Sequence, residues 1–214
     1  MKRPIRIAFL LMATIFAALA CSTTRVLDDG QYMLADNRIT VTNYKEFDTE
    51  GLESYLRQQP NYYFIFRWNP FINVYNWQNG KGGIWDKFVK KIGTEPVVYD
   101  SEKVEESIEN ISNRLEYLGY YGSKVESHLK LKKKRVFVHY DVTLGKRFPI
   151  KDIILTLPED GTFAQDYLAD TSGTLIHPGD YLSEDILEKE TVRATAVMNR
   201  KGYYSFNKHY FFFE

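Results

Sequence analysis

The chain has 214 residues, of which 44% are hydrophobic, and its 28 basic side chains equal its 28 acidic ones. This balance excludes a polycation of the kind that binds nucleic acid through its phosphates. The length allows one domain or two small ones. Its single cysteine, Cys21, excludes a disulfide framework and a cluster of thiolate metal ligands.

The N-terminus has the pattern of a secretory signal. Three basic residues, Lys2, Arg3 and Arg6, precede an uncharged and mostly apolar run over residues 7–20, which is too short to span a bilayer. Cleavage after residue 20 would leave 25 basic against 28 acidic side chains, because the signal takes three of the 28 basic residues and no acidic one. Two interpretations of this signal remain open. Either Cys21 is modified after cleavage, or the segment is an ordinary signal peptide that leaves Cys21 as a free thiol.

A first domain is predicted after a short polar tether over residues 21–30. The alternation over residues 38–43 predicts a strand. Asp48 or Thr49 can then cap a helix that ends before Pro60. That helix would carry Leu52, Tyr55 and Leu56.

Residues 61–97 form an insertion that contains ten aromatic residues between Tyr62 and Phe88. Its Asn-Pro, Asn-Gly and Gly-Gly pairs predict that it holds no long regular element. Three interpretations remain open: a lid whose rings form a small satellite core, an interface for a protein partner or the membrane surface, and a platform that stacks on carbohydrate. All three tryptophans lie here: Trp68, Trp77 and Trp85.

A helix follows, with Asp100 as its N-cap and Gly119 as its C-cap. Apolar residues spaced by four, three, four and three positions lay one stripe along it. The stripe comprises Val104, Ile108, Ile111, Leu115 and Leu118.

Beyond Gly119 the period changes to two, which predicts a β-hairpin. Its first strand, residues 121–131, has Val125, Leu129 and Leu131 on one face. A basic turn over residues 132–135 leads into a second alternating strand that ends near Val142.

The helix and its glycine occur twice, 83 residues apart. Gly119-Tyr120-Tyr121 falls on Gly202-Tyr203-Tyr204, and Asp100 falls on Ser183, another N-cap residue. The spacing predicts tandem small domains. The alternative is two unrelated amphipathic helices that each end in Gly-Tyr-Tyr.

A second domain is therefore predicted over residues 146–214, after a linker over 145–150. We expect a strand from Ile150 to Leu157, a short helix over 163–168, the repeat helix over 183–201 and a last strand over 203–213. Because no return strand follows, we expect this second domain to be incomplete and the chain to stop early.

No catalytic constellation stands out. The histidines lack ligand-like spacing, and no nucleophile elbow or phosphate-binding glycine loop is present. We expect no enzyme activity, no cofactor and no metal site. The four histidines are His128, His139, His177 and His209.

Two groups of residues resemble known families. Ala18-Leu19-Ala20-Cys21 resembles the lipobox of bacterial lipoproteins, whose cysteine is acylated. The order strand, helix, helix, strand, strand, with both Gly-Tyr-Tyr corners, resembles POTRA domains of the BamA and TamA outer-membrane assembly superfamily. Four segments, at residues 58–61, 75–76, 91–93 and 95–97, are similar to the lipid-anchored TamL-type relatives.

The resemblance implies an α+β fold of tandem POTRA-like domains on the periplasmic side of the outer membrane, anchored by lipid at Cys21. It also implies a scaffold that binds unfolded outer-membrane proteins or a TamB-like periplasm-spanning protein. From the charge balance we expect no binding of nucleic acid. An extended client would add to the edge strand after the second helix. The partner-binding residues would then be Tyr121, Ser123, Val125, Ser127, Leu129 and Leu131, with Trp68, Trp77 and Trp85 in the insertion.

Two rival hypotheses stay open. A free-standing outer-membrane lipoprotein would bind a partner or glycan through the aromatic insertion, and would lose that binding when the three tryptophans are replaced together. A lipid-anchored hydrolase would need a catalytic constellation that the sequence does not display.

Overall fold

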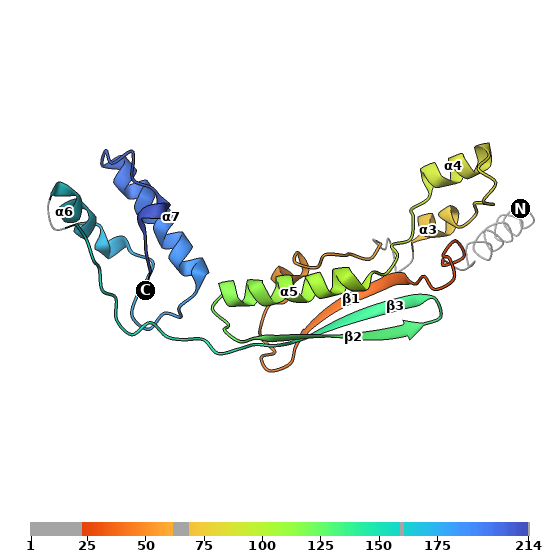
Figure 1. Ribbon diagram of the computed structural model, residues 1–214, viewed down its shortest axis with the longest axis horizontal. Helices are drawn as coiled ribbons and strands as arrows, with labels where there is room; N and C mark the ends of the chain where they lie inside the picture. The colour runs from red at the N-terminus through yellow and green to blue at the C-terminus, as the bar shows by residue number, and fades with distance from the viewer. Residues whose placement is uncertain (1–22, 62–68, 159–160, 214) are drawn as a thin grey trace, which may run out of the picture. The chain divides into compact units, whose positions relative to one another are not determined.

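The computed structural model describes residues 23–61, 69–158 and 161–213 (Figure 1). The chain forms two compact units. The first takes residues up to 40, 49–108 and 126–141, and the second takes 41–48, 109–125 and 142 onward. The predicted signal sequence and Cys21 lie outside the described residues, as does Trp68.

The sheet has three strands, β1 (Met33–Val41), β2 (Lys124–Lys132) and β3 (Arg135–Thr143), in the order β1-β3-β2. The Met33 amide donates to the Lys134 carbonyl, and the Thr42 amide donates to the Val142 carbonyl. From the first bond to the second, the residue numbers rise along both strands, so β1 runs parallel to β3. The strand predicted over 38–43 is confirmed over 38–41, but β1 ends at Val41 and begins earlier, at Met33. Its first residues escaped prediction because Met33, Leu34 and Ala35 form a continuous apolar run rather than an alternation.

The core lies between the sheet and helix α5 (Ser101–Tyr117), which Figure 1 shows along one face of the strands. As predicted, the Asp100 carboxylate caps the helix by accepting from the Glu102 amide at 3.0 Å. Val104, Ile111 and Leu115 of the apolar stripe are buried, whereas Ile108 and Leu118 are half-buried, and Ser107 faces inward beside Ile108. The buried core side chains are Val104, Ile111 and Leu115 on α5 and Val136, Val138, Tyr140 and Val142 on β3.

Ser107 is buried because its hydroxyl ties α5 to the segment after α2 (Glu50–Glu53). Its Oγ donates to the Lys103 carbonyl at 2.6 Å and accepts from the Arg57 amide at 2.8 Å. Helix α2 is shorter than predicted, and Thr49 makes no side-chain cap. Leu52 and Leu56 are nevertheless buried, so the apolar pattern was correct although the helix that it predicted ends early.

The insertion contains two short helices, α3 (Pro70–Tyr75) and α4 (Ile84–Ile92). Asn69 caps α3 by accepting from the amides of Phe71 and Ile72. The end of α4 packs tightly against the end of α3, since a Cβ added at Gly93 would lie 2.6 Å from the Tyr75 Cα. The prediction of no long element in this insertion is confirmed for its described residues.

Residues 23–30 are more ordered than the polar tether that the sequence predicted. Leu27 is buried against Met33, Ala35 and Phe137 on the sheet. In addition, Nζ of Lys134, in the β2–β3 turn, donates to the carbonyls of residues 27 and 28 and pairs with Asp29. The tether thus continues the fold of the first unit.

The second unit contains the repeat helix α7 (Glu184–Arg200), which has the same 17-residue length as α5 and lies 83 positions later. Both helices end in the same pair of hydrogen bonds, and both terminal glycines have positive φ, 86° and 100°. This is the Schellman arrangement. The bonds run from Gly119 to Glu116 and Tyr120 to Leu115, and from Gly202 to Asn199 and Tyr203 to Met198.

Two predicted strands in the second unit are wrong. Residues 150–157 and 203–213 form no strand, and the latter contain a 3-10 turn, η2 (Lys208–Tyr210). A strand needs a neighbouring strand with which its backbone forms a ladder of hydrogen bonds, and the described part of this unit provides none along these segments. In the second segment, the rings of Tyr203 and Phe206 pack instead on Phe163 of α6 (Thr162–Leu168). This helix confirms the predicted short helix, and η1 (Thr171–Gly173) follows it.

Among the helices that the structure describes, none combines the length and the apolar character needed to cross a bilayer.

Candidate functional site

The two edges of the sheet differ. On the β1 side, the Leu34 amide donates to the Val97 carbonyl at 2.8 Å and the Tyr99 amide donates to Tyr32 at 2.7 Å, with a bridge between Met33 and Val98. On the β2 side, no segment within the described ranges pairs with the outer edge. Strand β2 therefore offers unpaired backbone groups, which can extend the sheet.

Strand β2 is unusually exposed for an element with an apolar alternation. Leu129 and Leu131 expose 47% and 58% of their surface, and Val125 and Ser127 are half-buried. The lysines at 124, 130 and 132 keep the strand soluble. The predicted half-buried strand is confirmed as a strand, but its apolar face is covered only near its start.

Two of the predicted partner-binding residues lie before the strand. The backbone amide and carbonyl of Tyr121 are both bonded to Lys146, so Tyr121 has no backbone group left for an added strand. Ser123 Oγ donates to the Tyr120 carbonyl and accepts from the Gly145 amide, so it shapes the corner. The open edge therefore begins at Lys124.

The histidines do not form a ligand set. His128 lies 3.4 Å from Asp141 across the hairpin, and His177 lies 3.2 Å from Asp180. No group of three metal-ligating side chains is found in the part of the chain that the structure describes.

The insertion brings two of the three predicted tryptophans together. Trp85 Nε1 donates to the Trp77 carbonyl at 3.3 Å, and the Trp85 ring lies 6.1 Å from that of Phe88. Trp77 and Trp85 expose 38% and 51% of their surface. Trp77, Trp85 and Phe88 therefore lie at the surface rather than in the satellite core that the lid interpretation expects.

A polar frame holds the described part of the insertion in place, and it uses residues of three of the four segments quoted for the resemblance, 58–61, 75–76 and 95–97. Asn61 donates to the Glu95 carbonyl and accepts from the Val97 amide, which closes the base of the insertion. Gln58 bonds the backbone of Val98 and Asp100. Asn76 accepts from the Val26 amide and donates to the Thr23 carbonyl.

The loop before α4 is organised by Asp86, which is buried. Its carboxylate accepts from the amides of Asn79 at 2.7 Å and Gly82 at 2.9 Å. The hydrogen bond from Asn79, helped by that from Gly82 and by the charge of Lys90, outweighs the effect of burial and lowers the pKa of Asp86. The carboxylate is thus held ionised, and each of its two oxygens accepts a hydrogen bond from the backbone of the loop.

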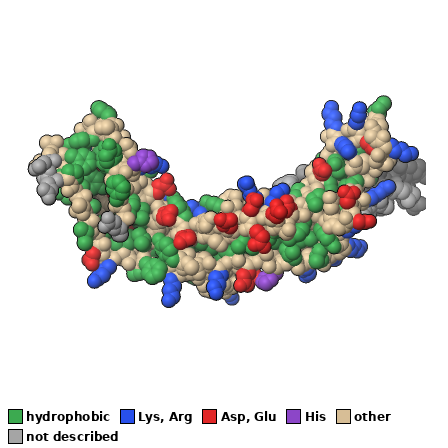
Figure 2. Space-filling view, viewed as in Figure 1, with side chains coloured by type: hydrophobic (Ala, Val, Ile, Leu, Met, Phe, Trp, Pro, Cys, Tyr) green, Lys and Arg blue, Asp and Glu red, His purple; other side chains and the backbone are tan. Residues whose placement is uncertain are grey.

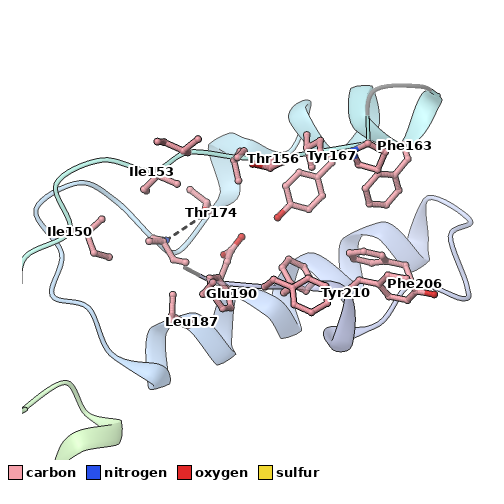
Figure 3. A pocket seen from close by; sticks show the side chains of 18 of the residues that line it. Ile150, Ile153, Thr156, Phe163, Tyr167, Thr174, Leu187, Glu190, Phe206 and Tyr210 are labelled. Carbon is pink, nitrogen blue, oxygen red and sulfur yellow. Dashed lines mark hydrogen bonds between the residues drawn. The ribbon is translucent and has the colours of Figure 1, made fainter.

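The second unit contains an apolar cavity of about 1220 Å³ (Figure 3). The two segments that were predicted as strands line it, together with α6 and α7. Glu190 lies in its wall, so the cavity is apolar with one buried carboxylate. Rings that line it include Phe163, Tyr167, Tyr203, Phe206, Tyr210 and Phe211.

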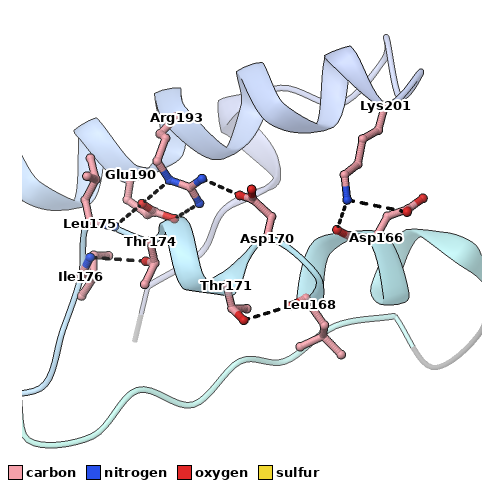
Figure 4. A network of polar contacts seen from close by, with 10 residues as sticks. All are labelled: Asp166, Leu168, Asp170, Thr171, Thr174, Leu175, Ile176, Glu190, Arg193 and Lys201. Carbon is pink, nitrogen blue, oxygen red and sulfur yellow. Dashed lines mark hydrogen bonds and ion pairs between the residues drawn. The ribbon is translucent and has the colours of Figure 1, made fainter.

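That carboxylate belongs to an ionic network (Figure 4). Arg193 donates to both oxygens of Glu190 and pairs with Asp170, while Glu190 also accepts from the Leu175 amide at 2.8 Å. Burial alone would raise the pKa of Glu190, but the bonds from Arg193 and Leu175 outweigh it and lower that pKa. The sequence pattern did not reveal this network, because its members are scattered along the chain.

The linker over residues 145–150 is fixed within the second unit. The Arg147 guanidinium lies between the rings of Tyr120, at 4.9 Å, and Tyr181, at 4.2 Å.

The hydroxyl of Tyr117 donates to Glu188 at 2.7 Å, and this bond raises the pKa of Tyr117 to about 12. The first helix of the repeat thus contacts the second directly.

These features, a helix-covered sheet with a hairpin at one edge, match a known family. A model of POTRA, described as a surface antigen variable number repeat, matches residues 37–145. The chain belongs to the POTRA family. The match runs from β1 to the end of the hairpin, so the POTRA domain includes the open β2 edge and the insertion.

A solved structure shares this similarity at low sequence identity. The crystal structure of POTRA domains 3–5 of Haemophilus influenzae BamA is 14% identical, with a TM-score of 0.33. The alignment covers 80% of this chain and 51% of that one, so the chain spans about half the length of that structure. No curated protein matches the chain. The predicted α+β POTRA fold is confirmed by the family match and by the observed order of elements.

Proposed function

We propose that this chain is a scaffold of an outer-membrane protein assembly or translocation factor, and that it binds extended segments of other proteins at β2. It would face the periplasm and be held to the outer membrane by lipid at Cys21. A scaffold of this kind performs no chemistry on its clients, which fits a POTRA domain without a recognised catalytic constellation. Residues 146–214 would belong to a second POTRA domain.

The open edge of β2 carries this proposal. An extended client that lies along β2 would gain backbone hydrogen bonds at every second residue, and these bonds do not depend on the client's sequence. The exposed side chains of Leu129 and Leu131 would add contacts to alternating apolar residues. Unfolded outer-membrane proteins have this alternation, as would an extended β-strand of a TamB-like partner.

Proline replacement at neighbouring positions of β2 tests the edge. In an edge strand one amide of each neighbouring pair bonds β3 and the other points outward. We therefore expect one of the two variants Glu126→Pro and Ser127→Pro to keep the stability of the chain. Both variants should lose at least tenfold in affinity for an extended peptide. The peptide is a ten-residue β-strand of an outer-membrane barrel, and its crosslinking to a photoreactive residue at Leu129 is measured.

The matched control is Asp36→Pro on β1, the edge that Val97–Tyr99 covers. A chain with this change that remains folded should crosslink as strongly as the unchanged chain. If the stable member of the β2 pair still crosslinks the peptide at full strength, β2 is not the binding edge.

A further inference from the structure

Helix α4 exposes an apolar face, which comprises Ile84, Trp85, Phe88 and Ile92. These side chains expose 89%, 51%, 53% and 46% of their surface. At about 100° per residue they occupy one arc of about 100° on the helix. The residues that face the protein are Asp86 and Val89, which are buried. The exposed face is therefore apolar, the reverse of an ordinary surface helix.

Lysines occupy the arc beside this face. Lys87, Lys90 and Lys91 are all exposed, and Lys81 is exposed in the preceding loop. The single acidic residue of α4, Asp86, faces inward and accepts two backbone hydrogen bonds. The outer surface of α4 thus carries only positive charge, on a chain whose predicted mature form carries a slight excess of acidic residues. Figure 2 shows lysine or arginine side chains beside exposed apolar ones over α4.

The insertion also holds the start of the described chain. Asn76, which ends α3, bonds the Val26 amide at 3.0 Å and the Thr23 carbonyl at 3.1 Å. Thr23 follows Cys21 by two residues, which span at most about 7 Å. A lipid on Cys21 would therefore enter the membrane close to α3, against whose end α4 packs through Gly93 and Tyr75.

We infer that the apolar face of α4 lies in the headgroup region of an anionic membrane, with its lysines on the lipid phosphates. Aromatic and aliphatic side chains beside lysines are the composition of helices that lie in this interface. Each basic residue near an anionic surface strengthens such binding, and an acyl chain nearby supplies the second attachment that stable anchoring requires. The inference rests in part on the proposed lipid anchor.

Quenching of Trp85 by brominated lipids tests this inference. The mature chain is purified with its N-terminal modification and carries Trp68→Phe and Trp77→Phe, so that Trp85 is the only fluorophore of its kind. It is reconstituted in vesicles of phosphatidylcholine and phosphatidylglycerol, with bromine on the acyl chains. We expect at least twofold quenching of Trp85. A chain with Trp85→Phe and Tyr204→Trp in the same background, which places an exposed ring outside the insertion, should show none.

Charge reversal tests the role of the lysines. Lys87→Glu, Lys90→Glu and Lys91→Glu together should reduce the quenched fraction of Trp85 at least threefold. The matched control is Lys45→Glu, Lys151→Glu and Lys208→Glu, which makes the same change in net charge at exposed positions outside the insertion. This control should retain the quenching.

The outcomes separate the inference from the proposed function. The mass of the N-terminal peptide shows whether Cys21 is acylated, and crosslinking at β2 reports client binding. An acylated, vesicle-bound chain with an unquenched Trp85 would overturn the membrane inference and leave the scaffold proposal intact.

If Cys21 is not acylated, quenching of Trp85 on addition of vesicles still supports the inference, and the absence of quenching overturns it. A Trp85 that responds to a purified envelope protein but not to lipid would also overturn it, as a protein-binding site.

Discussion

At the residue scale, two glycines in equivalent positions meet different surroundings. Gly119 and Gly202 both end a 17-residue helix with positive φ. A Cβ added at Gly119 would lie 2.2 Å from the Leu182 carbonyl oxygen, whereas nothing lies within 4 Å of one added at Gly202. Gly119 therefore serves both the helix cap and the close approach of the Leu182 backbone.

We expect Gly119→Ala to lower the free energy of unfolding by about 3 kcal/mol or more, because it adds a backbone clash to the left-handed strain. The matched variant Gly202→Ala bears only the strain and should lose about 1 kcal/mol. Urea unfolding followed by circular dichroism measures both. Equal losses at the two positions would show that the approach of Leu182 has no energetic consequence.

The residue scale is also where the sequence predicted most. Asp100, Ser183 and both glycines were identified as caps, and all four occupy those positions, because a cap is decided by neighbours within one helical turn. Ser107 was missed, because its burial depends on the Arg57 amide, 50 residues away in sequence.

At the element scale, helix α7 is attached to the segment before it by charge. Arg193 bonds both Glu190 and Asp170, and the side chain of Glu190 is only 7% exposed. A cation removed from such a cluster leaves a nearly buried carboxylate without its main partner. This attachment complements the aromatic packing of α6.

We expect Arg193→Met to cost about 3 kcal/mol in the free energy of unfolding. Lys189→Met, which breaks the exposed pair with Asp185 on the same helix, should cost less than about 0.5 kcal/mol. Because the folded-state pKa of Glu190 is lowered, its contribution is complete above the ordinary value of 4.5 and is lost as pH falls through the folded pKa. The urea midpoint, measured at pH 7 and again below pH 4.5, should differ less between Arg193→Met and the unchanged chain at the lower pH.

Elements that depend on distant partners were predicted less well. The alternation in residues 150–157 was read as a strand, yet Ile150 alone in that segment has backbone bonds to residues 179–180, and the rest of it lines the apolar cavity. An alternating pattern reports where apolar side chains lie, but a strand also needs a ladder. Helix α4 went unpredicted although its apolar residues have helical spacing, because the Asn-Gly and Gly-Gly pairs just before it indicate turns.

At the scale of the whole molecule, the segment over residues 23–30 and residues 126–132 of the proposed binding strand belong to one compact unit. The Lys134 ammonium, at the tip of the β2–β3 hairpin, bonds the backbone of Leu27 and Asp28. The neighbouring Lys133 is exposed. The hairpin tip thus holds the segment that leads to Cys21.

We expect Lys134→Met to release this segment and to speed tryptic cleavage after Arg25 about fivefold, the effect of losing roughly 1 kcal/mol of hydrogen bonding. Lys133→Met, in the same turn, should leave the rate unchanged. The rate is followed by mass spectrometry under native conditions at low protease concentration. Equal acceleration in both variants would mean that the turn, rather than the Lys134 bonds, orders the tether.

The family assignment was also within reach of the sequence, since the order of elements and the two Gly-Tyr-Tyr corners are local patterns. The residue at which the open edge of β2 begins could not be predicted from the sequence. Residues 121–131 were predicted to be available, but the contacts of Tyr121 and Ser123 move its start to Lys124. Those contacts come from residues 145 and 146, which only the folded corner brings near.

The Lys134 attachment also has a mechanical consequence. A strand paired to β2 would lie on a hairpin whose tip is fastened to residues 27–29, so tension on that strand would be carried through the hairpin toward the proposed lipid anchor. A pull along the strand loads its hydrogen bonds in parallel, and they must fail together. A pull across the strand opens them one at a time, from one end, at much lower force. The direction in which a bound segment is drawn would thus decide whether the chain grips it or lets it go.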